Sequence, residues 1–397
     1  MRHRLPLCAL VLGATALGSL AVGGAAANPA IVFDVATGQV IAHQDAFQRW
    51  YPASLTKLMT AYVAFRAIEA GELTLASPIT MSKHAAAEPP SKMGFKPGQV
   101  VTLDNALKML IVKSANDIAM AIGENVGGSQ EAFAARMNAE ATRLGMTGSH
   151  FVNPNGLHHL DQYTTAHDLA LLVRSIRTEF PLYRSYFAIE ALGAGKKVMK
   201  SNVDLLGRFN GADGMKTGFI CPSGFNLVAS ATRNDRTLAA VVLGAVNPHV
   251  RADQAADLLG KGFEQASAPS ATLATLAPYG EGRETATDMR GEICDRPSKS
   301  EKLDKVDKKG RPVFASPYLH ERGRPLKVVK VELGGATGPV PAAFAAALAA
   351  GTAPNISDVP IPTPRPPYPA AADEAPAQPS GGGVKAKEPA KAAQVAG

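Results

Sequence analysis

Residues 30–266 are predicted to adopt an α+β fold, in which one antiparallel sheet is flanked by helices. Three observations support this prediction: a hairpin pattern at the start of the region, a series of helical patterns in its middle, and two β-rich segments followed by a helix near its end. Because strand patterns lie at both ends, we expect N-terminal and C-terminal segments to meet in the same sheet.

The first expected elements are a hairpin and a helix. The stretch AIVFDVATGQVIAH, residues 30–43, places strand-type residues on both sides of a turn at Thr37-Gly38. Residues 54–70 have the apolar spacing of an amphipathic helix. The apolar positions of this helix are Leu55, Leu58, Tyr62 and Phe65.

Further helices are expected in the middle of the region, at residues 105–112, 117–126, 130–144 and 166–176. Ser129 and Thr165 stand where N-caps are preferred, and Gly145 follows the end of one helix. After them, FNLVASATR and RTLAAVVLGAV predict two antiparallel strands joined by Asn234-Asp235. A helix over residues 251–263 closes the region.

Composition and charge limit the functional classes. With 397 residues, of which 46% are hydrophobic, the chain is long enough to bury a large core. The net charge of +7 favours anionic surroundings, but no nucleic-acid-binding motif accompanies it, so we expect no nucleic-acid partner.

The two ends of the chain differ from the region between them. Residues 1–27 have two early arginines, an apolar run and a small-residue end, which predicts a cleaved signal peptide and export to the periplasm or cell-wall space. Residues 269–335 form a poorly defined extension, with a solvated basic loop at 295–312 and a strand in PLKVVKVELGG. Residues 336–397 read as an Ala/Pro-rich disordered tail, and we expect no stable membrane anchor.

Three cysteines occur in the sequence. Cys8 lies within the signal peptide, so its cleavage leaves Cys221 and Cys294. An exported protein can form one bridge from two cysteines, but their spacing leaves open whether these two are joined.

Ser54 and Lys57 are the first candidates for chemistry. A serine hydroxyl needs a base within hydrogen-bonding reach, and residues three apart on a helix share a face, so Lys57 can serve as that base. To act as a base, the lysine must have its pKa depressed by burial or by a neighbouring cation. Backbone N–H groups at the helix N-terminus can also stabilise an oxyanion beside Ser54.

Two further motifs follow in order. Ser114-Ala115-Asn116 lies between two expected helices, and Lys216-Thr217-Gly218 is expected at the start of a strand. The SxxK, SxN and KTG motifs each occur once, and stretches such as PASLTKLMTAY, SKMGFKPGQ and DGMKTGFICPSGFNLVASATR accompany them. The chain thereby resembles the low-molecular-mass penicillin-binding proteins of the serine-type D-alanyl-D-alanine carboxypeptidase family, whose motifs serine β-lactamases share.

The resemblance implies a β-lactamase/transpeptidase-like fold, with a helical subdomain and a cleft beside the sheet. It implies a catalytic domain over residues 28–268, peptidoglycan stem peptides as substrates and β-lactams as inhibitors, with no cofactor and no metal. Ser54 would be the nucleophile and Lys57 the general base. Ser114 would relay a proton to the departing D-alanine, and Asn116 would bind the peptide backbone and hold Lys57.

Further roles follow for the KTG strand and its surroundings. Lys216 would lower the pKa of Lys57 by charge repulsion. Thr217, assisted by Arg251, would bind the terminal carboxylate. The backbone N–H groups of Ser54 and Phe219 would form the oxyanion hole. A side chain at Gly218 would block an acyl group that lies along the strand, and the bulk of Phe219 is expected to narrow the mouth of the site.

Several other interpretations are less well supported. A cluster of metal-ligand residue types suggests zinc, but it falls where the resembled family has a structural loop, so Asp168 is interpreted as a capping residue. The cluster consists of His158, His159, Asp161, His167 and Asp168. No G-x-S-x-G elbow supports a Ser-His-Asp hydrolase, and no Glu-x-x-Leu-Asn segment supports a β-lactamase. The motifs do not separate carboxypeptidase from D,D-endopeptidase activity; a non-catalytic wall-binding scaffold is the alternative of another class.

Overall fold

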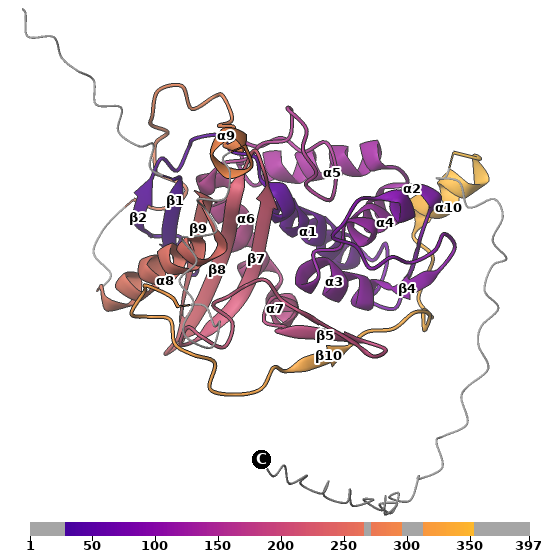
Figure 1. Cartoon of the computed structure of the whole chain (residues 1–397). Coiled ribbons are helices and arrows are strands. Elements are labelled where there is room, and N and C mark those ends of the chain that lie inside the picture. The colour runs from indigo at the N-terminus through magenta and orange to yellow at the C-terminus, as the bar shows by residue number, and fades with distance from the viewer. Residues whose placement is uncertain (1–27, 266–270, 296–312, 353–397) are drawn as a thin grey trace, which may run out of the picture. The chain divides into compact units, whose positions relative to one another are not determined.

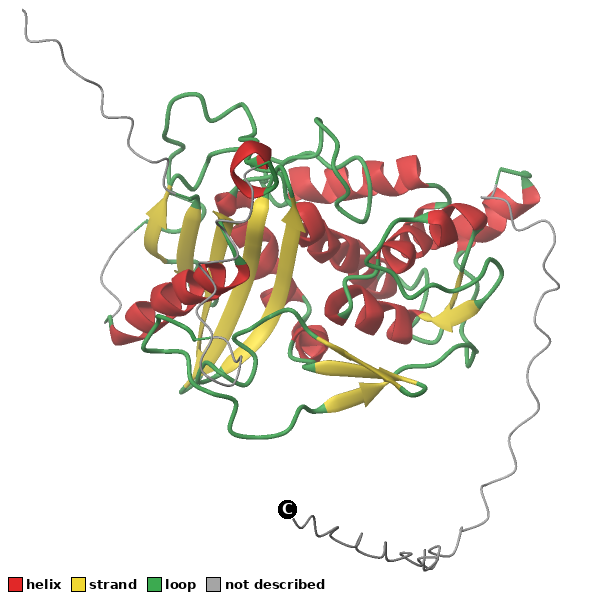
Figure 2. Cartoon of the chain, viewed as in Figure 1, coloured by secondary structure: helices red, strands yellow, loops and turns green. Residues whose placement is uncertain are grey.

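The computed structural model describes residues 28–265, 271–295 and 313–352. Its main sheet has five antiparallel strands in the order β2-β1-β9-β8-β7 (Figures 1 and 2). The strands are β1 (Ala30–Asp34), β2 (Val40–Gln44), β7 (Ala212–Ile220), β8 (Gly224–Arg233) and β9 (Arg236–Ala245). Because β1 pairs with β9, the prediction that both ends of the region meet in one sheet is confirmed.

The two predicted turns are explained by their backbone conformations. At the β1–β2 turn Gly38 has φ 73°, and the Asp34 carboxylate accepts hydrogen bonds from two N–H groups of the same turn. At the β8–β9 turn both Asn234 and Asp235 have positive φ, as a two-residue hairpin that matches the strand twist requires. Asn and Asp tolerate this conformation better than most residues.

The predicted helices are present with the expected centres and somewhat different ends, whereas the short helix α2 (Lys83–Ala87) was not predicted. Ser129 and Thr165 cap their helices through side-chain oxygens that accept from Ala132 N and Asp168 N, as expected. The principal helices are α1 (Thr56–Glu69), α2 (Lys83–Ala87), α3 (Leu103–Val112), α4 (Asn116–Gly127), α5 (Gln130–Arg143), α6 (Ala166–Glu179) and α8 (Pro248–Glu264). The last of these begins three residues before the predicted start, because the Asn247 side chain caps it.

Helices cover both faces of the sheet, as Figure 1 shows for α6 and α8. Alternate residues of β9 point to opposite faces: Ala240 and Val242 pack in a small cluster with α8, whereas Val241 packs in the larger core with α6 and α1. The prediction that α1 is amphipathic is wrong, since the helix is buried on nearly all sides. It runs between α3, α4, α5 and α6, so its polar residues face protein.

Smaller elements lie outside the main sheet. Two short strand pairs and two short helices were not predicted from the sequence. They are β3 (Pro78–Thr80) with β4 (Val100–Thr102), β5 (Ala191–Ala194) with β6 (Lys197–Lys200), η2 (Pro181–Tyr183) and α7 (Arg184–Phe187). The strand expected within PLKVVKVELGG is present as β10 (Val328–Lys330), parallel to β5. The predicted disordered tail needs correction, because residues 342–349 form α10 (Ala342–Ala349), which buries Phe344 and packs on α4.

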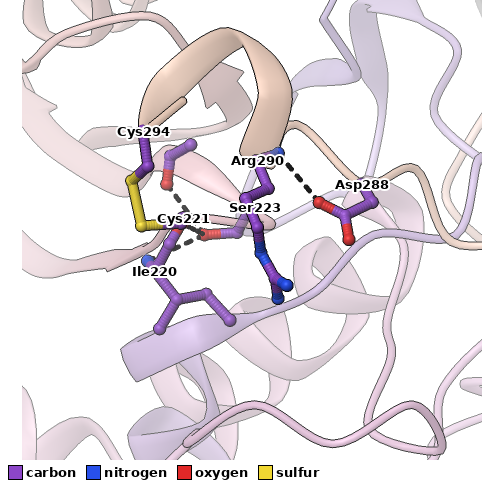
Figure 3. The surroundings of a disulfide bond; sticks show 7 residues. Ile220, Cys221, Ser223, Asp288, Arg290 and Cys294 are labelled. Carbon is purple, nitrogen blue, oxygen red and sulfur yellow. Dashed lines mark hydrogen bonds between the residues drawn. A yellow bond between two sulfur atoms is a disulfide. The ribbon is translucent and has the colours of Figure 1, made fainter. Parts of the chain in front are cut away.

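The extension contains a segment, residues 283–294, that we call the strap. Figure 3 shows Cys294, after the short helix α9 (Arg290–Ile293), joined to Cys221 by a disulfide bond, which settles the pairing that the sequence left open. Within the strap, Met289 N donates to Pro222 O at 2.9 Å. The strap therefore ties the end of β7 to the C-terminal part of the chain.

The predicted signal peptide, nearly all of the 295–312 loop and the tail beyond residue 352 lie outside the described residues. Among the residues that are described, none of the helices combines the length and apolar character needed to cross a membrane.

Candidate active site

Ser54 lies in a tight turn, and not within the α-helix that the sequence predicted to start there. It belongs to the 3-10 helix η1 (Ala53–Leu55), directly before α1. Ala53 has φ 47°, a conformation that costs on the order of 1–3 kcal/mol for a residue with a side chain. The Asn226 side chain on β8 holds this turn by donating to Tyr51 O and Pro52 O at 3.0 and 3.3 Å.

Lys57 is fully buried one turn below the serine. Its Nζ lies 2.9 Å from Ser54 Oγ, 2.8 Å from Asn116 Oδ1 and 2.5 Å from the main-chain oxygen of Asn155. Burial, and then the charge of Lys216, hold the pKa of Lys57 well below its usual range. The structure therefore brings the predicted nucleophile and base into contact and supplies both causes of a depressed pKa.

Ser114 and Asn116 lie at the junction of α3 and α4, as predicted. Ser114 has φ 59°, a second strained residue in the site. Asn116 holds Lys57 through Oδ1, while its Nδ2 donates to Pro89 O at 2.9 Å and to Pro90 O at 3.3 Å. The amide is thus engaged within the protein, and the expected contact with a substrate backbone would have to replace one of these bonds.

The KTG motif lies in the second half of β7, so its predicted place at the start of a strand is wrong. The reason is that strand pairing with β8 begins upstream, at Ala212. Lys216 is buried, and its Nζ donates to Ser114 Oγ at 2.8 Å and to Thr217 O at 3.0 Å. Burial and the charge of Arg251 lower the pKa of Lys216 to about 7.

Gly218 allows β7 to approach the nucleophile turn. A Cβ at this position would lie 2.8 Å from Pro52 O and 3.1 Å from the backbone nitrogens of Ser54 and Leu55. The close packing of two protein segments is therefore sufficient to require glycine, independently of any acyl group. Because β7 is also the edge of the five-stranded sheet, its outer side is available for strand-like pairing.

The remaining predicted residues are Thr217, Phe219 and Arg251. Thr217 is buried next to it, and Phe219 is 44% exposed with its ring stacked on Phe225 at 4.3 Å. Arg251 is not on the surface but buried on α8, where its Nη2 donates to Asp204 Oδ2 at 3.2 Å. Its Nε has no hydrogen-bond partner among the described residues. A buried guanidinium with an unused N–H is suited to an incoming carboxylate.

Sequence reasoning missed two parts of the site. The first is Asn155-Gly156, where a Cβ on Gly156 would lie 1.8 Å from Ala53 O, so this loop packs directly on the nucleophile turn. The second is Glu88, whose Oε2 accepts from Asn155 Nδ2 at 3.0 Å. The only local signal was NPNG, a turn-type sequence whose glycine has φ 85°.

The histidine and aspartate cluster is dispersed in space. His158 packs edge-on against Tyr51, whereas buried His167 lies 2.7 Å from Leu273 O through Nε2. Asp168 does not cap its helix; its Oδ2 accepts from Gly148 N and Ser149 Oγ, because Thr165 already occupies the cap position. No group of three metal-ligand side chains suited to an ion occurs in the described ranges.

Comparisons with known proteins agree with this geometry. A model of the D-alanyl-D-alanine carboxypeptidase family matches residues 19–247. D-alanyl-D-alanine carboxypeptidase DacC of Escherichia coli is 36% identical over 247 residues, which cover 59% of this chain and 60% of that protein. The chain thus matches less than two thirds of the length of this relative.

Solved structures show the same fold. Penicillin-binding protein 5 from Haemophilus influenzae matches with a TM-score of 0.58 and 30% identity, over 60% of this chain and 71% of that one. Penicillin-binding protein D2 from Listeria monocytogenes, in its ampicillin-bound form, matches with a TM-score of 0.53 and 28% identity, over 60% of this chain and 97% of that one. The predicted β-lactamase/transpeptidase-like fold is confirmed. Together with the family match over residues 19–247, these likenesses establish that the chain belongs to the D-alanyl-D-alanine carboxypeptidase family.

Proposed function

We propose that the chain is a serine-type D-Ala-D-Ala carboxypeptidase, which removes the terminal D-alanine from peptidoglycan stem pentapeptides through an acyl-enzyme and is inhibited by β-lactams. The observation that carries the proposal is the 2.9 Å contact between Lys57 Nζ and Ser54 Oγ in a buried site. The ampicillin-bound relative supports the inhibition. Residues 28–268 would form the catalytic domain, exported by means of the signal-like residues 1–27.

Hydrogen-bond counting supports a proton transfer from Ser54 to Lys57. A neutral lysine amine has two N–H groups and one lone pair, and the carbonyl oxygens of Asn116 and Asn155 can only accept. These two oxygens take the two N–H groups, so the lone pair faces Ser54 Oγ. The serine hydroxyl then donates its proton to Lys57 as Oγ attacks the carbonyl carbon between the two D-alanines.

The rest of the reaction follows from the neighbouring groups. The backbone N–H groups of Ser54 and Phe219 would stabilise the oxyanion, while Thr217, Lys216 and Arg251 would hold the terminal carboxylate. When the C–N bond breaks, Ser114 would relay the proton that Lys57 took from Ser54 to the nitrogen of the departing D-alanine, which leaves Lys57 neutral again. Water then cleaves the serine ester with Lys57 again as base, which regenerates the free hydroxyl.

Two assays test the proposal. Fluorescent penicillin should label the wild-type protein and the surface control Ser185→Ala, but not Ser54→Ala; labelling of Ser54→Ala would overturn the assignment of the nucleophile. Absence of labelling in all three would favour the wall-binding scaffold. In chromatography of digests, a pentapeptide muropeptide should lose one D-alanine, whereas conversion of cross-linked dimers to monomers alone would indicate a D,D-endopeptidase.

A further inference from the structure

One short segment, Glu88–Ser91, supports both carbonyl groups that hold the proposed base. The Asn116 side chain donates to the carbonyls of Pro89 and Pro90, and its backbone N–H donates to Ser91 O at 2.7 Å. The Asn155 side chain donates to Glu88 Oε2 at 3.0 Å. The two carbonyl groups that accept hydrogen bonds from Lys57 are therefore both fixed by the same four residues.

Glu88 is an unusual residue for this place. Its side chain is only 8% exposed, and burying a carboxylate is costly unless it is paired or hydrogen-bonded. The bond from buried Asn155 and a loose approach of His84 Nε2, at 3.8 Å, are its side-chain contacts among the described residues. These two contacts offset only part of the free-energy cost of burying the Glu88 carboxylate, which points to a role for Glu88 in the neighbouring active site.

The charges around Lys57 oppose one another. Burial, and then the charge of Lys216 on β7, depress the pKa of Lys57, whereas Glu88 and Asp117 on α4 raise it. The pKa of Lys216 is itself lowered by burial and then by Arg251 on α8. The Asp117 carboxylate is engaged by the N–H groups of residues 93 and 94. Burial raises the pKa of Glu88 itself, His84 on α2 and the bond from Asn155 lower it, and Glu124 on α4 raises it.

We propose that Glu88 is a positioning residue for the base: it orients Asn155, so that the carbonyl of this residue holds Lys57, and its negative charge keeps the amine from becoming too weak a base. The inference rests on the proposed function. Its physical reason is that a general base works best when its pKa lies near the working pH. Without Glu88, only Asp117 would oppose the burial and the Lys216 charge that depress the pKa of Lys57, so proton transfer from Ser54 would become less favourable.

Two substitutions separate the two parts of this role. In Glu88→Gln the amide oxygen still accepts from Asn155, but the charge is lost, so the acid limb of the acylation rate should move to lower pH by roughly one unit. In Glu88→Ala the anchor of Asn155 is lost as well, and the maximal rate should fall by up to about 100-fold, because small displacements of reacting groups are costly. Glu72→Gln, a surface carboxylate paired with Arg136, is the matched control.

The experiment measures the rate of acylation by fluorescent penicillin between pH 4 and 9 for the full-length wild type and the three variants. A wild-type pH profile in Glu88→Gln together with a wild-type maximal rate in Glu88→Ala would overturn the inference. If Glu88→Ala does not fold, as judged by circular dichroism, the pH profile of Glu88→Gln decides alone. A wild type that shows no Ser54-dependent acylation would instead refute the proposed function.

Discussion

The disulfide bond between Cys221 and Cys294 gives a prediction whose size follows from its place in the chain. The bond closes a loop with a sequence separation of 73 residues. In the chain-entropy model, a loop of this length lowers the entropy of the unfolded state enough to stabilise the fold by about 4 kcal/mol at 25 °C. For a domain of this size, that corresponds to a melting temperature higher by roughly 10 °C.

The assay compares thermal unfolding of the oxidised protein, the protein with a phosphine reductant, and the double variant Cys221→Ser/Cys294→Ser. The reduced protein and the double variant should melt at the same temperature, about 10 °C below the oxidised protein. Adding reductant to the double variant is the control and should change nothing. A difference below about 2 °C between oxidised and reduced protein would refute the reasoning.

The disulfide bond should also influence the active site, because the strap contacts both the segment that precedes the nucleophile turn and the segment that follows β7. Met289 N donates to Pro222 O at 2.9 Å, and Thr287 N donates to Arg49 O at 3.4 Å. Arg49 leads to the nucleophile turn, and Pro222 follows the KTG strand. At a temperature where the reduced protein is still folded, we therefore expect penicillin to acylate the reduced protein more slowly than the oxidised protein. Reoxidation should restore the rate.

Three further predictions concern the substrate side of the site. Gly218→Ala should lower acylation by labelled penicillin at least about tenfold, since its Cβ would lie 2.8 Å from Pro52 O; an unchanged rate would contradict the close packing. Arg251→Leu should raise KM for pentapeptide about tenfold or more while kcat changes less, because a charge-assisted hydrogen bond is lost. KM should also rise as pH increases through about 7, where Lys216 loses its charge, and this rise should move to higher pH in Arg251→Leu; a KM independent of pH from 6 to 9 would contradict it.

Local pattern was sufficient to predict much of the fold and half of the site. The β8–β9 pair and its turn are read directly from alternating apolar residues around Asn234-Asp235, and the contact between Ser54 and Lys57 follows from a spacing of three residues. Such features depend on neighbours in the chain, so periodicity and spacing reveal them. The caps at Ser129 and Thr165 are local in the same sense.

The features that the sequence did not reveal depend on distant contacts. Asn155 and Lys57 are 98 residues apart, and Glu88 and Asn155 are 67 apart, so no window of sequence contains either pair. The error over α1 has the same origin. Its pattern of apolar and polar residues resembles a surface helix, but the polar residues Thr56 and Thr60 are buried against the loop that carries Asn155.

The two buried lysines differ in the number of acceptors that the fold provides. This difference explains how Lys57 is suited to be neutral while Lys216 is suited to carry a charge. Lys57 has three oxygen neighbours, two of which can only accept, so its neutral form is satisfied and its lone pair faces Ser54. Lys216 has two acceptors within the described ranges, Ser114 Oγ and Thr217 O, although its ammonium has three N–H groups. Under the proposed function, a substrate carboxylate would accept from the third N–H and favour the charged form of Lys216. Binding of the substrate would then charge Lys216, and that charge would keep Lys57 neutral when a base is needed.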